Sequence, residues 1–315
     1  MQISGGVTLS GGVNLAPGSG GSSGGSYSFQ GSNYGYTAGG YRGSVSNIID
    51  KFPFSSDGNA TDVGDLTEAR YNVSGQSSSE SGYTSGGANP AKNTIDKFPF
   101  ASDTNATDVG DLTQAKSQVA GQSSSASGYA SGGYPETNTI DKFSFSSDGN
   151  ATDVGDLAET RSAPAGQSSA TSGYTSGGRL PGISPDYRNT IDKFPFASDG
   201  NATDVGDLTV VGRHGTGQSS TENGYNSGGG ATSGSTNTID KFPFASDTNA
   251  TDVGDLTIAR DKSAGQSSTA SGYTSGDGPN PKVTIDKFSF SSDGNATDVG
   301  DLSVGGESIG GGQQY

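Results

Sequence analysis

The chain has 315 residues, of which 54 are glycine and 28% are hydrophobic, and its formal net charge is −16 with a pI near 4.2. So acidic a surface repels nucleic-acid backbones and acidic lipid headgroups, which argues against both as partners. No apolar run approaches membrane-spanning length, which argues against insertion into a membrane.

Residues 1–25 form a glycine-rich N-terminal arm or linker that differs from the rest of the chain. They lack the basic n-region and continuous apolar h-region of a signal peptide. One interpretation is a frayed, disordered terminus. The other is a short β-arm that docks onto another subunit or a larger assembly, because its apolar face is too small to fold alone. That face consists of Ile3, Val7, Leu9, Val13 and Leu15.

From residue 26 to about residue 304, one unit recurs six times with a period of 45 to 51 residues by subtraction. Each copy contains four short segments rich in strand-forming residues and separated by turn-forming ones. In the second copy these are 75–79, 82–87, 93–100 and 106–113. Four strands per unit and six units predict an all-β fold, a six-bladed β-propeller of four-stranded blades.

The first unit starts with a degenerate first strand near Ser26–Gln30, and residues 305–315 are left as a glycine-rich C-terminal tail. We expect the ring to close by packing of the first blade against the last, with the arm lying along the ring. Exchange of a strand from the C-terminal segment 304–315 or from the arm is an alternative closure. An open solenoid, in which the units stack linearly, is an alternative fold.

The order of segments resembles the kelch repeat, in which an aromatic residue and a Gly-Gly doublet follow a strand of small residues. Tyr83, Gly86 and Gly87 stand for the aromatic residue and the doublet, and residues 95–100 for the third strand. Val109 lies where kelch units usually carry Trp, which this chain lacks. The amino-acid sequence of the units also resembles repeats in predicted tail-fibre and other virion proteins of marine bacteriophages.

The loops after the second and fourth strands of a blade leave on one face, and in this chain they differ between units. The loops on the opposite face hardly change. One interpretation is a recognition face on a rigid scaffold. The other is ordinary drift of exposed loops. Tyr and Arg side chains anchor protein partners or stack on sugars, so the candidates for a ligand-binding face are Tyr41, Arg42, Tyr134, Arg179, Tyr187 and Arg188.

The constant loops carry Asp57, Asn59, Asp62 and Asp65 in the first unit. Oxygen ligands at this spacing resemble the opening of a calcium loop, so a weak calcium site is one interpretation. The glycine and glutamate of a complete EF-hand loop are missing. The other interpretation is turn formation, since Asp and Asn cap their own backbone in Asx-turns. Asn59 also begins an Asn-Ala-Thr sequon that recurs in all units, and we expect the turn to explain it.

Catalytic chemistry is not expected. The chain has no cysteine, and its one histidine, His214, lies in a glycine-rich loop, where we expect an exposed imidazole without a relay partner. Paired carboxylates recur alike in all six copies, which suits architecture better than an active site. We therefore expect a protein that is not an enzyme and needs no cofactor.

These observations and the resemblance together imply a structural or recognition protein on the exposed surface of a bacteriophage particle, such as a tail fibre. The arm would join other virion proteins, the chain would form a homo-oligomer within the assembly, and the variable loops would bind a host-surface glycan or protein. The alternative is a cellular or secreted kelch-type module that binds a protein or glycan.

Overall fold

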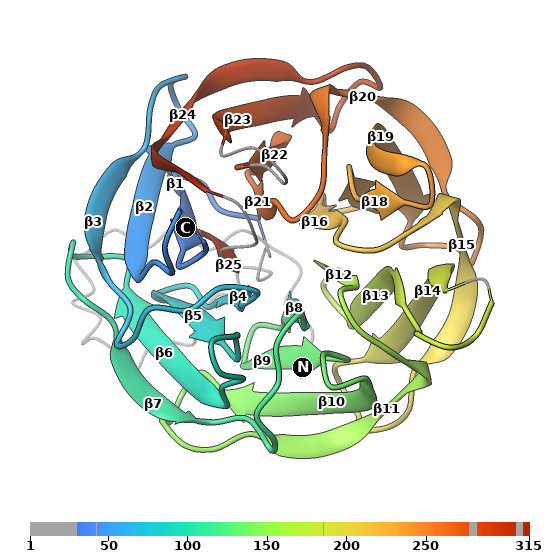
Figure 1. Cartoon of the computed structure of the whole chain (residues 1–315), viewed down its shortest axis with the longest axis horizontal. Coiled ribbons are helices and arrows are strands. Elements are labelled where there is room, and N and C mark those ends of the chain that lie inside the picture. Colours follow the sequence, from blue (N-terminus) through green and yellow to red (C-terminus); the bar gives the residue numbers. More distant parts are fainter. Residues whose placement is uncertain (1–29, 42, 185, 277–281, 307–310) are drawn as a thin grey trace, which may run out of the picture.

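Six antiparallel sheets surround a central axis in the computed structural model, which describes residues 30–41, 43–184, 186–276, 282–306 and 311–315 (Figure 1). The described residues form strands, turns and loops, without a helix. The sheets follow one another around the ring in chain order, as the blades of a propeller do. The predicted all-β fold and six-bladed β-propeller are confirmed, and the linear solenoid is wrong.

Each blade is an antiparallel meander of four strands, named here from the axis outward. Blade 1 contains β25 (Gly311–Gln314), β1 (Tyr34–Ala38), β2 (Ile48–Pro53) and β3 (Thr61–Asp65). Blade 2 contains β4 (Ser74–Ser77), β5 (Ser81–Ser85), β6 (Thr94–Pro99) and β7 (Thr107–Asp111). Blade 3 contains β8 (Ala120–Ser123), β9 (Ser127–Ser131), β10 (Thr137–Ser144) and β11 (Thr152–Arg161).

Blades 4 to 6 repeat this order with longer outer strands. Blade 4 contains β12 (Ala165–Ser168), β13 (Ser172–Arg179), β14 (Tyr187–Pro195) and β15 (Thr203–Gly212). Blade 5 contains β16 (Thr216–Ser219), β17 (Asn223–Ser227), β19 (Gly234–Pro243) and β20 (Thr251–Arg260), and a short strand β18 (Gly230–Ala231) pairs with the start of β19. Blade 6 contains β21 (Ala264–Ser267), β22 (Ser271–Ser275), β23 (Lys282–Ser289) and β24 (Thr297–Gly306).

The register within a blade explains why the second strand reads Gly-Tyr. In blade 2, Gly82 lies opposite Phe98, and the Phe98 ring occupies the space that a side chain at position 82 would need. A Cβ added to Gly82 would come within 2.3 Å of Phe98 Cζ. The next residue, Tyr83, points to the other side of the sheet because side chains alternate along a strand.

The apolar core lies between the blades. Tyr83 of blade 2 stacks on Phe145 of blade 3 with 4.8 Å between ring centroids, and Phe143 tilts against it at 5.5 Å. The same trio recurs around the ring and ends with Tyr273 of blade 6 against Phe52 and Phe54 of blade 1. Each aromatic pair adds about 0.5–1.5 kcal/mol beyond its buried area. Sequentially equivalent residues therefore join every blade to the next, including the last to the first.

The ring closes through the C-terminal strand. β25 supplies the innermost strand of blade 1 and pairs with β1, with Gly35 opposite Gln314. The innermost position of blade 1, expected for a strand near Ser26–Gln30, is taken by residues 311–314 of the segment predicted as a tail, and of residues 26–30 only Gln30 is described. The favoured closure, blade packing alone, is replaced by strand exchange from the C-terminal segment. A chain whose ends share one blade cannot open without breaking that sheet.

A buried glutamine in every inner strand bonds to the second strand of the next blade. Gln167 Nε2 donates to Tyr225 O at 3.0 Å, and Gln313 Nε2 in the closing strand donates to Tyr83 O at 2.8 Å. The other members of this set are Gln76, Gln122, Gln218 and Gln266. Because the carbonyls belong to the backbone, this polar ring tolerates changes in the neighbouring side chain but not in the glutamine.

Candidate recognition face

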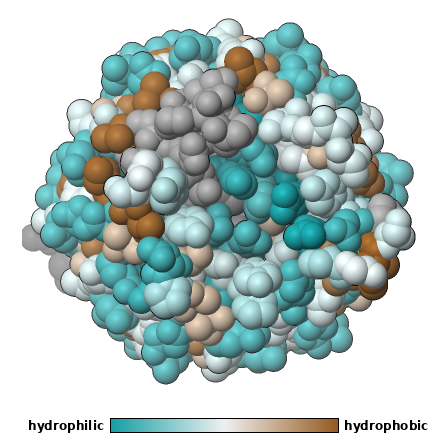
Figure 2. Space-filling model, in the orientation of Figure 1, coloured by the Kyte–Doolittle hydropathy of each residue, from teal (hydrophilic) through white to brown (hydrophobic). Residues whose placement is uncertain are grey.

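The loops predicted to vary lie together on the face seen in Figure 1, where the chain crosses from each outer strand to the next inner strand. We call this the variable face. Figure 2 shows it as a largely hydrophilic surface with a hollow near its centre. Its described residues are the loop segments 39–41, 43–47, 66–73, 86–93, 112–119, 132–136, 162–164, 180–184, 186, 213–215, 228–233 and 261–263, and the strand ends beside them.

Neighbouring loops on the variable face are joined mainly by backbone atoms. Ser117 N donates to Tyr134 O at 2.9 Å and Tyr134 N donates to Ser117 O at 2.6 Å. Nearer the axis, His214 N donates to Ala163 O at 2.8 Å. Five residues at this second loop position have a φ of 55 to 61°: Asn72, Gln118, Ala163, His214 and Lys262. Side chains on this face are therefore free to differ without loss of these bonds.

Tyr134 is the most exposed of the described candidate residues, with 52% of its surface accessible. Its backbone is fixed by the bridge to Ser117, so its ring is presented from an ordered loop. Tyr41 is half-buried and packs edge-on against Tyr71 with 5.9 Å between centroids. Arg42 lies outside the described residues. The structure therefore supports an accessible aromatic side chain at Tyr134 and a more enclosed one at Tyr41.

The remaining candidates gather at blade 4 and its neighbours. Arg179 Nη2 lies 3.2 Å from Asp186 Oδ2, and the Arg188 Nε lies 3.0 Å from Glu159 Oε1 of blade 3. The ring of Tyr187 faces a cation that the sequence did not single out: the guanidinium carbon of Arg213 lies 5.4 Å from its centroid. Among the described residues, Arg213 is therefore the cation that contacts the Tyr187 ring, whereas Arg179 and Arg188 are held by Asp186 and Glu159.

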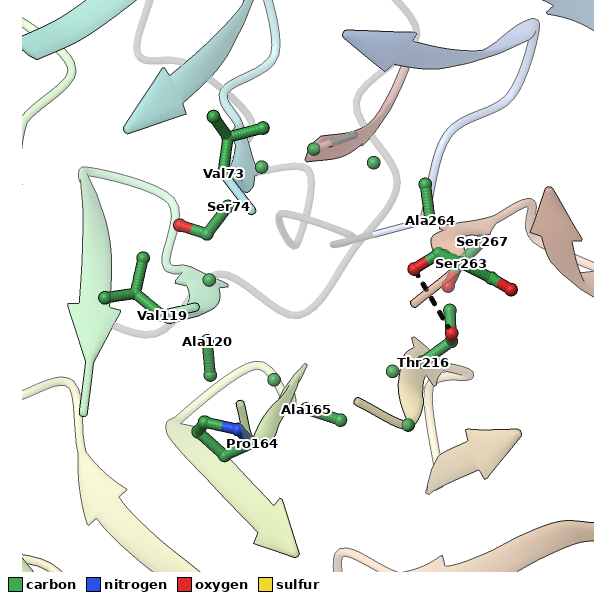
Figure 3. Close-up of a pocket in the computed structure, with 18 of the residues that line it drawn as sticks. Val73, Ser74, Val119, Ala120, Pro164, Ala165, Thr216, Ser263, Ala264 and Ser267 are labelled. Atoms are coloured by element: carbon green, nitrogen blue, oxygen red, sulfur yellow. Dashed lines mark hydrogen bonds between the residues drawn. The ribbon is translucent and has the colours of Figure 1, made fainter. Parts of the chain in front are cut away.

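A cavity of about 80 Å³ opens at the centre of the variable face, where the inner strands begin (Figure 3). Its walls carry small side chains, including Val73, Val119, Pro164 and Ala264, and the backbone of the inner-strand glycines. These glycines are required by close approach: a Cβ at Gly121 would lie 2.2 Å from Gly75 O. The described lining residues offer mostly backbone groups and no charged side chain. Such a lining favours shape over electrostatics in any ligand contact.

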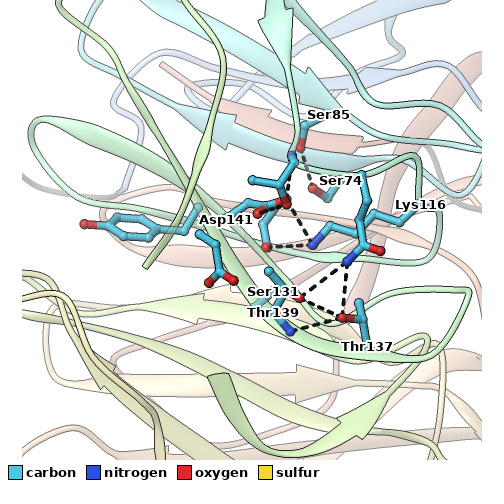
Figure 4. A network of polar contacts seen from close by, with 12 residues as sticks. Ser74, Ser85, Lys116, Ser131, Thr137, Thr139 and Asp141 are labelled. Atoms are coloured by element: carbon cyan, nitrogen blue, oxygen red, sulfur yellow. Dashed lines mark hydrogen bonds and ion pairs between the residues drawn. The ribbon is translucent and has the colours of Figure 1, made fainter. Parts of the chain in front are cut away.

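Beneath the variable face, four blades carry a basic residue at the end of the outer strand or shortly after it, and this residue forms a buried ion pair with an aspartate of the next blade. Lys116 Nζ lies 3.2 Å from Asp141 Oδ2, and Figure 4 shows this pair within its polar network. Both side chains are fully buried. Burial lowers the pKa of Lys116, an effect that the Asp141 carboxylate opposes. These pairs stabilise blade contacts and lie too deep to meet a macromolecular ligand.

His214 is buried, so the expected exposed imidazole is wrong. Only 2% of its surface is accessible, and neither ring nitrogen has a hydrogen-bond partner among the described residues. Burial lowers the pKa of His214 to about 3, and the positive charges of Arg213, Lys262 and Arg179 act in the same direction. The imidazole is neutral near pH 7 and serves as packing in the loop.

The acidic candidates on the opposite face make contacts that stabilise the ring. Asn59 Oδ1 accepts a hydrogen bond from Asp301 N of blade 6 at 3.1 Å, and Asp57 Oδ1 lies 3.0 Å from Lys287 Nζ. Asp62 Oδ1 accepts from Gly64 N at 3.2 Å, as in an Asx-turn. The described residues include no group of three or more side chains arranged to hold a metal ion. Asp65 N is itself held by the next unit's Asn105, at 3.1 Å.

The sequence predicted the variable face but missed three of its members. Arg213, Asp186 and Glu159 became visible only through their partners, although the first two lie in the same variable loops as the candidates.

The assembly-arm residues, Ile3, Val7, Leu9, Val13 and Leu15, lie outside the described residues. In the part of the chain that the structure describes, no helix has the length and hydropathy needed to cross a membrane. A comparison with protein-family models and with curated proteins finds no match. The kelch resemblance therefore stays a prediction, while the propeller itself is shown.

Proposed function

We propose that this protein is a non-catalytic recognition module that binds a protein or a glycan through its variable face. The observation that carries the proposal is the Arg–Tyr cluster of Arg179, Tyr187, Arg188 and Arg213, together with the exposed ring of Tyr134. Tyrosine and arginine supply large contact area at low conformational cost and are enriched at binding hot spots. They stand here on a frame that is nearly identical from blade to blade.

The distribution of charge also favours the variable face as the contact surface. On the opposite side, each unit contributes three aspartates, such as Asp57, Asp62 and Asp65, and one lysine, such as Lys51. Six units give eighteen carboxylates and six ammonium groups there, so most of the net charge of −16 lies away from the variable face. An acidic glycan or protein would be repelled by that surface and would approach the Arg–Tyr cluster.

The absence of a relay at the histidine supports a non-catalytic role. The ring nitrogens of His214 contact neither a carboxylate nor a hydroxyl among the described residues. The strongly buried carboxylates, such as Asp141 and Asp192, are held in blade contacts. We therefore propose that the polar side chains of the blades hold the fold together and that the polar side chains of the variable loops bind the ligand.

A glycan array and a bacterial-cell binding assay with the full chain test this proposal. Tyr134→Ser is expected to reduce binding about tenfold, the effect of losing a hot-spot side chain. Tyr34→Ser is the matched control, because Tyr34 is 36% exposed and lies at the opposite end of a second strand. Equal losses in both variants, or no loss in Tyr134→Ser and in a Tyr187→Ser/Arg213→Ser double variant, would contradict the proposal.

The narrower proposal is that the module belongs to the exposed surface of a bacteriophage particle, held to other virion proteins through the arm. The resemblance between the amino-acid sequence of the repeated unit and repeats in virion proteins supports this proposal. Deletion of residues 1–25 is expected to convert an oligomer into a soluble monomer in sedimentation experiments. The alternative, a cellular or secreted interaction module, predicts the same oligomeric state with and without residues 1–25.

A further inference from the structure

Among the described residues, the contact between blades 4 and 5 lacks the buried cation that four of the other five blade contacts have; at the fifth, between blades 6 and 1, the equivalent position is Gly306. At four contacts an Arg or Lys nitrogen lies 2.8 to 3.2 Å from an aspartate oxygen. The pairs are Arg70–Asp96, Lys116–Asp141, Arg161–Asp192 and Arg260–Asp286. Between blades 4 and 5 the aspartate is present as Asp240, but the residue that ends β15 is Gly212. The carboxylate is kept and its counterion is missing.

The acceptors that hold the cation elsewhere are also kept. Arg260 Nη1 donates to Gly276 O at 3.0 Å and to Thr284 O at 3.2 Å, while its Nη2 reaches Asp286. Arg161 uses the same three positions between blades 3 and 4. In blade 5 the equivalent residues are Gly228, Thr238 and Asp240. Two carbonyls and one carboxylate therefore surround the place that a cation would occupy.

A cavity of about 20 Å³ lies at this place, and Gly212, Gly228, Thr238 and Asp240 are all among its lining residues. A volume of this size holds about one water-sized group. An ammonium group has that size, and Lys116 shows that an ammonium fits the equivalent position between blades 2 and 3. Val210, Arg213 and Ala231 also line the cavity and are partly exposed, so it connects to the variable face.

Within the described part of the chain, no cationic side chain forms an ion pair with Asp240. It is 4% exposed, and its hydrogen bonds come from Thr209 N at 2.9 Å and Thr209 Oγ1 at 2.6 Å. Burial raises the pKa of Asp240, and the charge that adds to this effect is another carboxylate, Asp252. The nearby guanidinium of Arg213 lies over the Tyr187 ring instead. Burying a carboxylate without a cation is costly, which leaves a favourable place for one.

We propose that the cavity between blades 4 and 5 binds a small primary ammonium cation, which makes with Asp240 and the carbonyls of Gly228 and Thr238 the contacts that Arg161 and Arg260 make at their own blade contacts. The ligand class is an alkylammonium, either free in solution or as the tip of an amine side chain. The site is independent of the recognition proposed for Tyr134 and Tyr187, because a free amine can fill it without touching those rings.

The chain offers a matched control for this site. A Cβ added to Gly212 would have Gly230 O as its nearest neighbour, at 3.4 Å, which is an ordinary contact. Gly212→Lys therefore places the chain's own ammonium in the cavity, in the position that Lys116 takes between blades 2 and 3. We expect this variant to fold and to melt at a higher temperature than the natural chain.

The test is calorimetric titration and thermal melting of the full chain with methylammonium chloride at constant ionic strength. Methylammonium is expected to raise the melting temperature of the natural chain and to leave Gly212→Lys unchanged. Asp240→Asn is expected to weaken binding by about tenfold or more, because a hydrogen bond to a charged group is lost. Tetramethylammonium, which has no N–H donor, is expected to have no effect.

Three outcomes would overturn the proposal. The first is a methylammonium effect of equal size in the natural chain and in Gly212→Lys. The second is an equal shift with potassium or tetramethylammonium, since neither carries an N–H donor. The third is a Gly212→Lys variant that is folded but no more stable than the natural chain, which would show that Asp240 gains nothing from a cation.

Discussion

The C-terminal strand closes the ring, so Gln313 should contribute as much stability as a glutamine in the middle of the chain. Gln313 is fully buried, and its Nε2 donates to Tyr83 O at 2.8 Å and to Thr84 Oγ1 at 3.0 Å. Gln167 is equally buried and donates to Ser176 Oγ at 2.9 Å and to Tyr225 O at 3.0 Å. The two residues occupy equivalent positions and each donates two buried hydrogen bonds, although Gln167 Oε1 also accepts one from Ser176 Oγ at 3.2 Å, and they differ in how far they lie from a chain end.

We expect Gln313→Ala and Gln167→Ala each to lower the free energy of unfolding by at least roughly 1–3 kcal/mol, since each removes two or more buried hydrogen bonds worth about 0.5–1.5 kcal/mol apiece. The measurement is the urea midpoint followed by tyrosine circular dichroism, with the slope of the transition checked for constancy. A midpoint unchanged in Gln313→Ala but lowered in Gln167→Ala would refute closure by β25.

A deletion of residues 311–315 extends the same experiment. It removes the pairing of β25 with β1 and the stacking of Tyr315 on Phe100 at 5.2 Å. At least six further hydrogen bonds are lost, among them Tyr34 N to Tyr315 O and Gln314 N to Ser77 Oγ. At about 1 kcal/mol each, these bonds alone amount to roughly 6 kcal/mol. The deletion should therefore exceed the effect of Gln313→Ala at least twofold.

Three further substitutions test individual contacts. Ala158→Thr should stabilise the protein by about 1 kcal/mol, measured as a higher urea midpoint, because it supplies a hydroxyl to Asp192 Oδ1, which has no partner among the described residues. Lys193→Ala should change stability by less than about 1 kcal/mol, and high salt should erase the difference, because its pair with Asp247 is exposed. His214→Asn should abolish one component of acid destabilisation: the folded pKa of His214 is about 3 against a usual 6.5, so its stabilisation is present above pH 6.5 and is lost as the pH falls towards 3. That component has a slope of at most about 1.4 kcal/mol per pH unit, visible as a difference between the two midpoint-against-pH curves.

The repeated unit made the blades predictable because its signals are local. Alternation and turn residues place four strands in each copy, and the equal spacing of six copies predicts the ring. The closing strand was missed because only Gly312-Gln313 matches the Gly-Gln pair of the other inner strands, as in Gly75-Gln76. That pair was the available signal. The rest of the strand, Gln314 and Tyr315, departs from the Ser-Ser of the other copies.

Contacts between blades were not predictable from a local pattern. Asn105 was interpreted as part of a turn, but its Oδ1 accepts from Asp65 N, which lies 40 residues earlier in the chain. His214 was interpreted as exposed because its neighbours are glycine and arginine, whereas the left-handed loop position it occupies turns it into the protein. The site therefore follows from the sequence as a face and a set of loops. Its pairings, such as Arg213 with Tyr187, require the three-dimensional register.

The two faces differ in variability because they join neighbouring blades by different means. The constant face uses side chains and close backbone approach, and a Cβ at Gly155 would lie 2.3 Å from Gly200 O. The variable face uses backbone bridges, such as Ser162 with Arg179, whose equivalent in blade 2 is Ala88. The side-chain contacts and close backbone approach thus restrict the sequence of the constant face, whereas the backbone bridges leave the side chains of the variable face free to differ.

This difference predicts that replacing a whole loop on the variable face changes the free energy of unfolding less than adding one methyl group on the constant face. Replacement of residues 179–188 by the sequence of residues 88–92 should alter the free energy of unfolding by no more than about 1 kcal/mol, because the bridge to Ser162 survives and shortening a loop costs little. Gly155→Ala adds one methyl group but should cost about 2 kcal/mol or more, since φ at Gly155 is 157° and the neighbouring backbone must move. Urea unfolding of both variants measures the contrast. A loop exchange more damaging than Gly155→Ala would show that the variable loops are part of the folding core, and their differences between blades would then need a structural rather than a recognition explanation.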